Sequence, residues 1–303
     1  MRQRPRLGVI LAAVAGTVLT AILPLATDAK TRAALVGSFS MKGDVPGFGG
    51  FSGLEFSDDG LSFIALSDSA ALMTGTVRRN DRGAITAVDV TQPPRPLVDA
   101  QGQPLNDPFD DSEGLAAAPN GDLFVSFELV HRVVRYFADG TLAETLPVPS
   151  DFAGLEENSG LEGLALAPDG ALYALPEGDA AGVRAAPVFR YRGGRWDRAF
   201  EISEQDSWRP VGADFGPDGR LYVLERDFWG LLGFKSRLRR LSFDDSGLVS
   251  EDVLFSTRAG QLGNLEGLSI WQDQSGALRA TMISDNNFVP MLDTEFVDFV
   301  IHD

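Results

Sequence analysis

The chain has 303 residues, of which 44% are apolar, and a formal net charge of −17 at pH 7. This apolar content is enough for a sizeable core in one large domain or two small ones. The negative charge argues against partners such as nucleic acids and anionic lipid surfaces, which bind proteins through lysine and arginine. With no cysteine and only two histidines, disulfides and zinc sites built from these residues are excluded.

Residues 1–29 have the features of a secretory signal peptide. Arg2, Arg4 and Arg6 precede an apolar run over residues 7–25, and small residues follow it. A basic start, an apolar stretch and a small-residue cleavage region are typical of exported proteins. The alternative is an uncleaved membrane anchor, because the run approaches the ~20 residues that span a bilayer. We predict cleavage and a periplasmic or secreted protein, with membrane contact only if this segment stays uncleaved.

A short phrase then recurs five times along the chain. Each copy has a glycine, an apolar step, a turn sequence such as PNGD or PDGR, a second apolar run and a carboxylate. The copies begin at Ser52, Glu113, Glu162, Val211 and Glu266. Their glycines are 61, 49, 49 and 55 residues apart. Periods of this size are typical of β-propeller blades rather than of helical or leucine-rich repeats.

Each copy predicts a β-hairpin, because strand-forming runs such as LFVSF and LYVL flank its turn. Further strands are expected after the hairpins, around 84–90 and over 132–137, 188–193 and 237–243. Helical periodicity is hard to find beyond residue 29. These patterns predict an all-β fold.

The two ends of the exported chain are predicted to pair with each other. Residues 33–39 and 295–301 both have strand patterns. The residues after the fifth glycine and those from 30 to the first glycine amount to 60, about one blade. We therefore predict that residues 30–303 form a five-bladed β-propeller closed by the terminal strands. Six blades are the alternative, if the first, 61-residue interval or the terminal stretch contains a degenerate blade.

The predicted hairpin register brings carboxylates together. Counting outward from the turn at 119–122 puts Glu113 opposite Glu128, and the turn at 168–171 puts Glu162 opposite Glu177. Like charges directly opposite each other destabilise a strand pair. The pairing in two copies therefore indicates either a cation between the carboxylates or a retained proton. A closed ring would gather these hairpin ends around one mouth of its channel.

Oxygen ligands in this number suit Ca²⁺, with Mg²⁺ and Mn²⁺ as alternatives, because calcium takes six to eight flexible oxygen ligands. We expect the metal ligands to be Glu113, Glu128, Glu162, Glu177, Glu225, Glu266, Asp285 and Asn286. The alternative role for any one of these acids is to cap a turn or to accept from a blade-edge amide. The first and fourth copies lack the glutamate before glycine and carry an acid two residues after it, Glu55 and Asp214.

Several segments resemble the phytase-like family of exported bacterial proteins, described as "esterase-like activity of phytase". They are FSGLEFSDDG at 51–60, DSEGLA at 111–116, NSGLEGLALAPDG at 158–170, LERDFWGLLGFKSRLRRL at 224–241, and NLEGLSIW with ISDNNF at 264–288. The resemblance covers about residues 39–300 and implies a β-propeller whose acids hydrolyse phosphoric or related esters.

The resemblance also implies which residues form the site. They are Glu113, Glu162, Glu225, Arg226, Glu266, Asp285 and Asn286. Val211 departs from the pattern, since it occupies a position where three other copies have glutamate. An intact ring of acids is therefore not expected.

Two functional hypotheses follow. In the first, a cation bridges the acidic mouth and a small ester or anionic substrate, Glu162 or Glu113 is the general base, and Arg226 steadies the anion. Carboxylic esters or lactones are the alternative substrates. In the second, a Ca²⁺-stabilised propeller binds a sugar, peptide or cell-envelope partner without turnover. No G-x-S-x-G motif is present, and His131 is expected in a surface turn. We expect a monomer.

Overall fold

The computed structural model describes residues 32–43, 46–155, 160–178, 185–203, 207–289 and 292–302. The chain from Thr31 to Asp303 forms one compact unit. The predicted signal peptide, residues 1–29, lies outside the described residues. Among those that are described, no helix has the length and apolar character that a membrane crossing requires.

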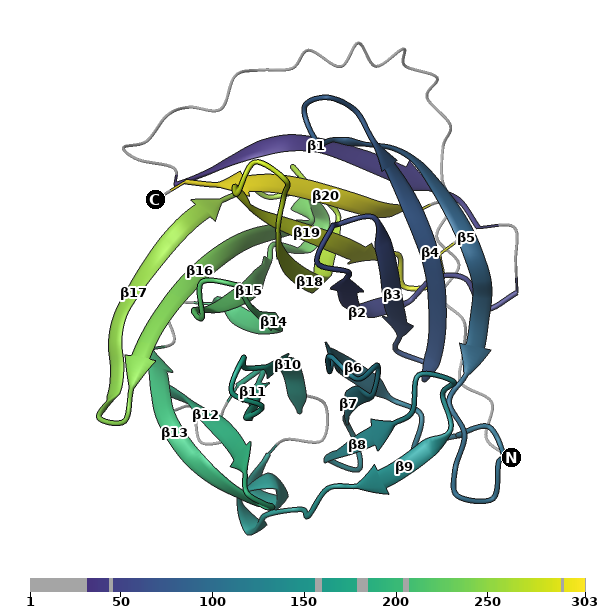
Figure 1. Ribbon diagram of the computed structural model, residues 1–303, viewed down its shortest axis with the longest axis vertical. Coiled ribbons are helices and arrows are strands. Elements are labelled where there is room, and N and C mark those ends of the chain that lie inside the picture. Colours follow the sequence, from purple (N-terminus) through teal and green to yellow (C-terminus); the bar gives the residue numbers. More distant parts are fainter. Residues whose placement is uncertain are drawn as a thin grey trace. The chain divides into compact units, whose positions relative to one another are not determined.

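The strands of this unit form five sheets (Figure 1). Blade 1 has β2 (Phe51–Phe56), β3 (Ser62–Ser67), β4 (Ala71–Arg79) and β5 (Ile85–Pro96). Blade 2 has β6 (Ser112–Ala117), β7 (Leu123–Phe127), β8 (Arg132–Tyr136) and β9 (Leu142–Thr145). Blade 3 has β10 (Leu161–Leu166), β11 (Leu172–Pro176), β12 (Ala185–Arg192) and β13 (Arg195–Ser203).

Blade 4 has β14 (Arg209–Phe215), β15 (Leu221–Phe228), β16 (Phe234–Asp244) and β17 (Gly247–Ser256). Blade 5 has β18 (Asn264–Gln272), β19 (Leu278–Asp285), β20 (Thr294–Ile301) and, from the other end of the chain, β1 (Ala33–Met41). Two short 3-10 helices, η1 (Ser150–Gly154) and η2 (Gly230–Leu232), lie in loops.

The predicted all-β, five-bladed propeller is confirmed, and the six-bladed alternative is wrong. Every blade is a four-stranded antiparallel sheet, and the five blades surround a common centre (Figure 1). The terminal strands close the ring as predicted. β1 pairs antiparallel with β20, in a register that runs from Ala33 opposite Ile301 to Met41 opposite Thr294.

A β-bulge interrupts the first hairpin of every blade at the repeated glycine. The register shifts between Phe51 and Gly53 in blade 1, and equivalent shifts occur in the other four blades. A bulge adds one residue to one strand, so two residues oppose one on the partner. The bulged position before the glycine is occupied in chain order by Ser52, Glu113, Glu162, Val211 and Glu266.

These bulges overturn the predicted opposition of glutamates. Leu161 pairs with Pro176 and Gly163 pairs with Leu175, so Glu162 has no partner directly opposite. In blade 2 the backbone N–H of Glu128 donates to the carbonyl of Asp111 at 2.8 Å, so Asp111 faces Glu128. Counting outward from the turn failed because each inner strand contains one residue more than regular pairing allows.

The glycines after the bulges are required where neighbouring blades meet. A Cβ on Gly212 would collide with the carbonyl oxygen of Glu266 in blade 5. A Cβ on Gly267 would likewise collide with the backbone of Gly53 in blade 1. The repeated glycine thus lets the innermost strands approach each other closely around the ring.

Apolar packing lies mainly between blades. Each of five buried clusters joins two neighbouring blades; one contains Leu224 of blade 4 with Leu268 and Met282 of blade 5. The repeat therefore has a physical basis, because a single blade cannot bury both of its faces alone.

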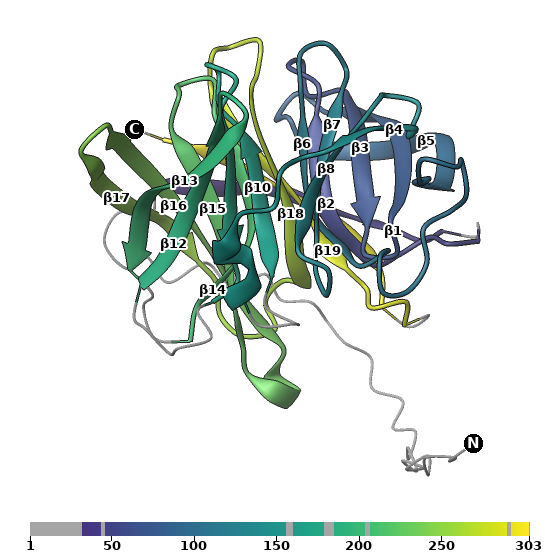
Figure 2. The same ribbon diagram turned by 90° about the horizontal axis from the view of Figure 1, so that it is seen from below.

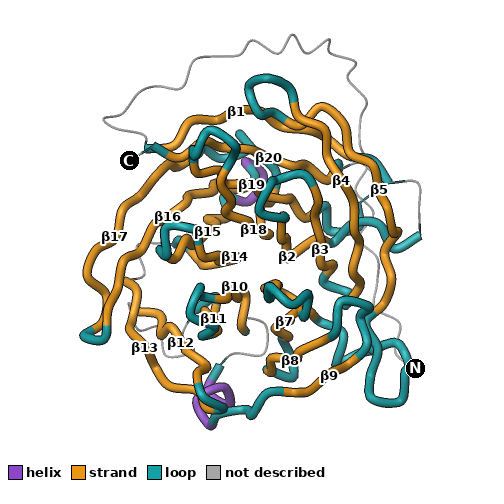
Figure 3. Tube along the Cα trace, in the orientation of Figure 1, coloured by secondary structure: helices purple, strands orange, loops and turns teal. Residues whose placement is uncertain are grey.

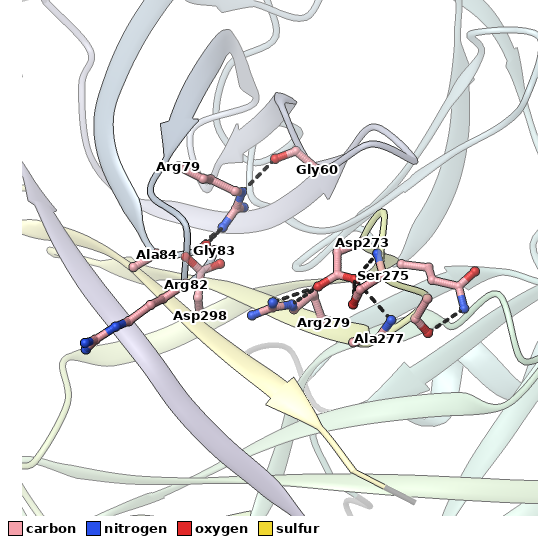
Figure 4. A network of polar contacts seen from close by, with 12 residues as sticks. Gly60, Arg79, Arg82, Gly83, Ala84, Asp273, Ser275, Ala277, Arg279 and Asp298 are labelled. Carbon is pink, nitrogen blue, oxygen red and sulfur yellow. Dashed lines mark hydrogen bonds and ion pairs between the residues drawn. The ribbon is translucent and has the colours of Figure 1, made fainter.

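A buried polar network joins the last blade to the first (Figure 4). Arg79 of β4 donates to Asp298 of β20 and to the carbonyls of Gly60 and Gly83, each at 2.9 Å. The guanidinium carbon lies 4.6 Å from the ring centre of Trp271. The side chains of Arg79 and Asp298 are only 9% and 3% exposed, so this ion pair is a buried part of the ring closure.

Candidate functional site

The five inner strands β2, β6, β10, β14 and β18 surround the middle of the ring (Figure 3). At its narrow centre, between the repeated glycines and their apolar neighbours, the cavity is only about 10 Å³. That volume is about the lower limit for one water molecule. The ring centre is thus nearly closed, and chemistry with a larger ligand belongs at a mouth of the channel rather than inside it.

The first strand of each blade begins, and the second ends, at one mouth of the ring. Carboxylates from four blades gather there. They are Asp68, Asp111, Glu113, Glu128, Glu162, Glu177, Glu266 and Asp285. We call this set the mouth carboxylates. Blade 4 contributes the guanidinium of Arg226 instead of an acid.

Three of the mouth carboxylates are close enough to share one metal ion. Asp111, Glu113 and Glu128 each offer a ligand oxygen, and these oxygens lie within 4.8 Å of one another. All three come from blade 2: Asp111 and Glu113 flank the first residue of β6, and Glu128 follows β7. Oxygen donors of this kind fit a hard cation such as Ca²⁺.

Burial and mutual repulsion raise the pKa values of the mouth carboxylates. Burial is the larger cause for Glu113, whose pKa lies well above its ordinary value, and the charges of Glu266 and Glu128 add to it. Burial, with the charge of Asp285, raises the pKa of Asp68 to about 7. The pKa of Glu266 also rises to about 7, mainly through burial, although Arg226 opposes the shift. Without a bound cation, part of this group is protonated near neutral pH.

Glu162 and Glu128 are linked at the centre of the group. Burial, with the charges of Glu113 and Glu177, raises the pKa of Glu162 well above its ordinary value. For Glu128, burial raises the pKa, while hydrogen bonds from the backbone N–H of Gly160 and from the Glu162 carboxyl lower it. The raised pKa of Glu162 therefore favours its protonated form, which can interact with Glu128.

Arg226 connects three blades at the mouth. Its guanidinium forms ion pairs with Glu266 of blade 5 and, at 3.2 Å, with Glu177 of blade 3. It also donates to Asn264 at 3.4 Å. Burial disfavours its charge, but Glu266, Glu162 and Glu177 raise the pKa of the guanidinium overall. Arg226 thus offsets part of the negative charge of the mouth.

The blade 5 acids are held by an amide. Asn264 donates from Nδ2 to Glu266 at 2.8 Å and to Asp285 at 3.5 Å. Asp285 also accepts from the backbone N–H of Asn287 at 2.6 Å. These hydrogen bonds fix both carboxylates on the blade 5 side of the mouth.

Two residues predicted as metal ligands have structural partners. Glu225 precedes Arg226 on β15 and therefore points to the other face of the blade, where it forms ion pairs with Arg237 and, at 3.4 Å, with Arg239. Asn286, next to Asp285, accepts through Oδ1 from the backbone N–H groups of Gly50 and Phe288, at 3.1 Å each. Their place in the ligand set stays a prediction.

The predicted ligand set lacked Asp68, Asp111 and Asn264, which the structure brings to the mouth. Asp68 occupies the same end of its hairpin as Glu128 and Asp285, so its repeat position was the available signal. Asp111 immediately precedes β6, and only the bulge brings it opposite Glu128. Asn264 opens β18, two residues before Glu266.

Glu55 and Asp214, the acids two residues after a repeated glycine, join neighbouring blades. Glu55 accepts from the backbone N–H of Ala117 in blade 2 at 3.0 Å, and Asp214 accepts from that of Ile270 in blade 5 at 2.5 Å. Burial raises the pKa of Asp214 to about 7. These acids serve as inter-blade acceptors. His131, for its part, is partly buried and packs beside Gly160 and Glu128.

Two pockets adjoin the mouth carboxylates on the side of blades 4 and 5. The first, of about 600 Å³, includes Lys42, Leu262, Asp285 and Leu292 in its lining. The second, of about 450 Å³, is lined by Glu177, Ser207, Arg209, Arg226, Asp227, Phe228, Phe234, Asn264 and Asn287. We call this second one the arginine pocket. Both are of a size that accepts small molecules.

The chain is similar to several solved propellers at low identity. A PQQ-bound aldose sugar dehydrogenase from Streptomyces coelicolor is 12% identical, with 90% of this chain and 99% of that chain covered and a TM-score of 0.46. A gluconolactonase from Xanthomonas campestris is 16% identical, with 78% and 68% covered and a TM-score of 0.40. At these values the similarities carry no argument about function.

None of the curated proteins matches this sequence. A family model, by contrast, matches residues 46–288, which is most of the chain and includes all of the mouth carboxylates. That model is described as "Phytase-like: Esterase-like activity of phytase". The chain therefore belongs to the phytase-like family.

Proposed function

We propose that this protein is an exported hydrolase that cleaves phosphoric or related esters at its acidic mouth with the help of a bound cation. The observation that carries the proposal is the trio of Asp111, Glu113 and Glu128, whose oxygens lie within 4.8 Å of one another. Such close carboxylates repel each other strongly unless a cation or protons offset their charge. The family membership supports ester hydrolysis as the chemical class.

The residues present fit a calcium ion better than a transition metal. Every candidate ligand is a carboxylate, and no cysteine occurs in the chain. Carboxylate oxygens suit Ca²⁺, while Mg²⁺ demands stricter geometry and keeps more of its waters. Asp111, Glu113 and Glu128 would hold the ion. A cation bound there supplies polarisation of an ester oxygen and a lower pKa for a bound water.

The other mouth residues would move the proton and orient the ester. A carboxyl with a raised pKa is suited to general acid–base work, and burial with acidic neighbours raises the pKa of Glu162 well above its ordinary value. As water adds to the phosphorus or carbonyl carbon, one of its protons goes to a carboxylate, the bond to the leaving oxygen breaks, and that oxygen takes a proton from a mouth carboxyl and leaves as an alcohol. Arg226, which lines the arginine pocket, would orient the anionic oxygen.

A second candidate function is binding without turnover, on a calcium-stabilised platform for a sugar, a peptide or a cell-envelope partner. One observation favours it. Arg226 is already paired with Glu266 and Glu177, so its guanidinium is only partly available to a substrate. In this case the mouth carboxylates would serve stability and recognition alone.

Assays with the purified chain separate the two candidates. Hydrolysis of phosphate monoesters, phosphate diesters and short acyl esters is measured with Ca²⁺ and with a chelator. The proposal expects turnover that the chelator removes and that Glu162→Gln reduces at least about 100-fold, the size of a general acid–base contribution. Glu201→Gln, on an exposed position of β13, is the matched control. Calcium-dependent stabilisation without turnover on any ester would contradict hydrolysis and support the platform.

A further inference from the structure

The arginine pocket is lined by both aromatic rings and charged side chains. One wall is aromatic, because the rings of Phe228 and Phe234 lie 4.9 Å apart and both line the pocket. Glu177 and Arg226 of the mouth also line this pocket. An ester bound here would meet both an apolar surface and charged side chains of the mouth.

The aromatic wall belongs to an unusually long hairpin. β15 and β16 pair from Leu221 opposite Leu241 to Phe228 opposite Phe234, and η2 closes the turn. By contrast, β3 and β4 of blade 1 are joined by only three residues. Figure 2 shows the β15–β16 hairpin reaching past the described strands of neighbouring blades. The extension places apolar side chains beside the mouth.

Side-chain contacts hold this hairpin beside its turn. Asp227 accepts from Ser207 at 2.6 Å and from the indole N–H of Trp229 at 2.5 Å. The ammonium of Lys235 lies 3.6 Å from the centre of the Trp229 ring. A wall fixed in this way is preorganised for a ligand, because little side-chain freedom remains to be lost on binding.

The charges that line the arginine pocket are balanced. Arg209 and Arg226 contribute two positive charges, and Glu177 and Asp227 contribute two negative ones. Glu266 also pairs with Arg226 at this pocket. A ligand with many phosphates would need several cations to offset the charge of these acids, whereas a ligand with one negative charge can be paired with an arginine.

We propose that the ester accepted by this site has an aromatic or bulky apolar group and at most one negative charge, as in an aryl phosphodiester. The apolar group lies against Phe228 and Phe234, and the charged oxygen lies toward Arg209 and Arg226. A cyclitol bearing many phosphates is expected to bind less tightly. The inference rests on the proposed function for the identity of the reacting bond, but the binding preference can be measured separately.

Calorimetric titration of the full chain in Ca²⁺ tests the preference without relying on turnover. The probes are the monomethyl ester of phenylphosphonate, dimethyl phosphate and myo-inositol hexakisphosphate. The phenyl probe is expected to bind about tenfold or more tightly than dimethyl phosphate, the effect of burying one ring. Phe228→Ala and Phe234→Ala should remove most of this difference. Arg209→Gln should weaken both monoanions alike.

Matched variants make each outcome decisive. Phe228 is 65% exposed, so its replacement by alanine leaves the core intact, and Phe137→Ala, at another exposed ring, should change nothing. Equal affinity for the two monoanions, tighter binding of the hexakisphosphate, or unchanged binding by both phenylalanine variants would overturn the inference. Tight phenyl binding with no ester turned over would contradict the proposed hydrolysis alone. Turnover of the hexakisphosphate as the best substrate would uphold hydrolysis and reject this preference.

Discussion

The junction where β4 meets β20 and the mouth of the channel both bury charged side chains, but they do so in opposite ways. At the junction Arg79 faces one carboxylate, Asp298, whose second oxygen accepts from Thr281 at 2.6 Å. At the mouth Arg226 of blade 4 pairs with two of the eight carboxylates, and a few amides donate hydrogen bonds to others. Paired charges close the ring, whereas the unpaired excess at the mouth needs protons or a cation.

The same contrast appears in single residues. Near the junction Asp273 is partly buried, yet hydrogen bonds from Ser275 and Arg279 lower its pKa to about 2 (Figure 4). At the mouth burial raises the pKa of Glu266 to about 7 even though Arg226 is in contact with it. Burial acts on both acids, and the number of local donors decides which direction prevails.

Removing one partner at the junction is expected to have the largest effect. Arg79→Ala leaves Asp298 buried and unpaired, which costs about 3–5 kcal/mol of folding free energy. For a chain of this size the melting temperature should fall by about 10 °C. Arg78→Ala is the control, because its ion pair with Asp89 is exposed. Equal melting temperatures for the two variants would contradict a structural role for the Arg79 pair.

The pH dependence of stability should come from the mouth. Glu266 and Asp68, with pKa values of about 7, bind protons in the folded state that the unfolded chain binds only near pH 4. Metal-free protein should therefore lose about 3 kcal/mol of stability as pH rises from 6 to 8. Asp273 titrates below this window and adds nothing to it.

Urea denaturation at pH 6 and pH 8, with chelator and with saturating Ca²⁺, measures this dependence. Calcium should remove most of it, because a bound cation stabilises the ionised carboxylates and adds binding free energy to folding. Metal-free protein that is equally stable at both pH values would show that the mouth carboxylates are ionised without a cation.

Arg226 forms the ion pairs that make this part of the mouth most similar to the junction. The stability cost of removing its charge should depend on pH. Arg226→Gln leaves Glu266 and Glu177 without their cation, which should cost about 2 kcal/mol at pH 8. The loss should shrink at pH 6, since Glu266 is then largely protonated. Arg198→Gln, at an exposed ion pair with Asp151, is the control. The same loss at both pH values would indicate that Arg226 acts by packing rather than by charge.

Much of the fold could be predicted because the repeat encodes packing. The spacing of glycines such as Gly53 and Gly114 follows from the contact between inner strands, and the strand patterns at both ends predicted the closing pair. The Arg79–Asp298 contact had no such signal. Its two residues are 219 positions apart, and nothing local marks either one as buried.

The site was harder to predict than the fold because its geometry depends on single-residue shifts. The glutamate positions identified the correct mouth, but the bulge changed which acid faces which and brought in Asp111. Glu225 comes one residue before the repeat position of Glu128 and Glu177, which Arg226 occupies in blade 4, so its side chain points to the other face and pairs with Arg237 and Arg239. A pattern gives the face of a strand only once the register is known.

The smallest predicted effect is a gain in stability, whereas Arg79→Ala is expected to lose stability. Glu113→Gln removes one of the three close carboxyl charges while keeping the side-chain shape, so metal-free protein should gain about 1 kcal/mol at pH 8. The same change should abolish the rise in melting temperature on adding Ca²⁺. Glu144→Gln, which alters an exposed ion pair with Arg135, should do neither. Destabilisation of the metal-free protein by Glu113→Gln would mean that Glu113 is already paired. The mouth would then be built like the junction, and the argument for a cation there would fail.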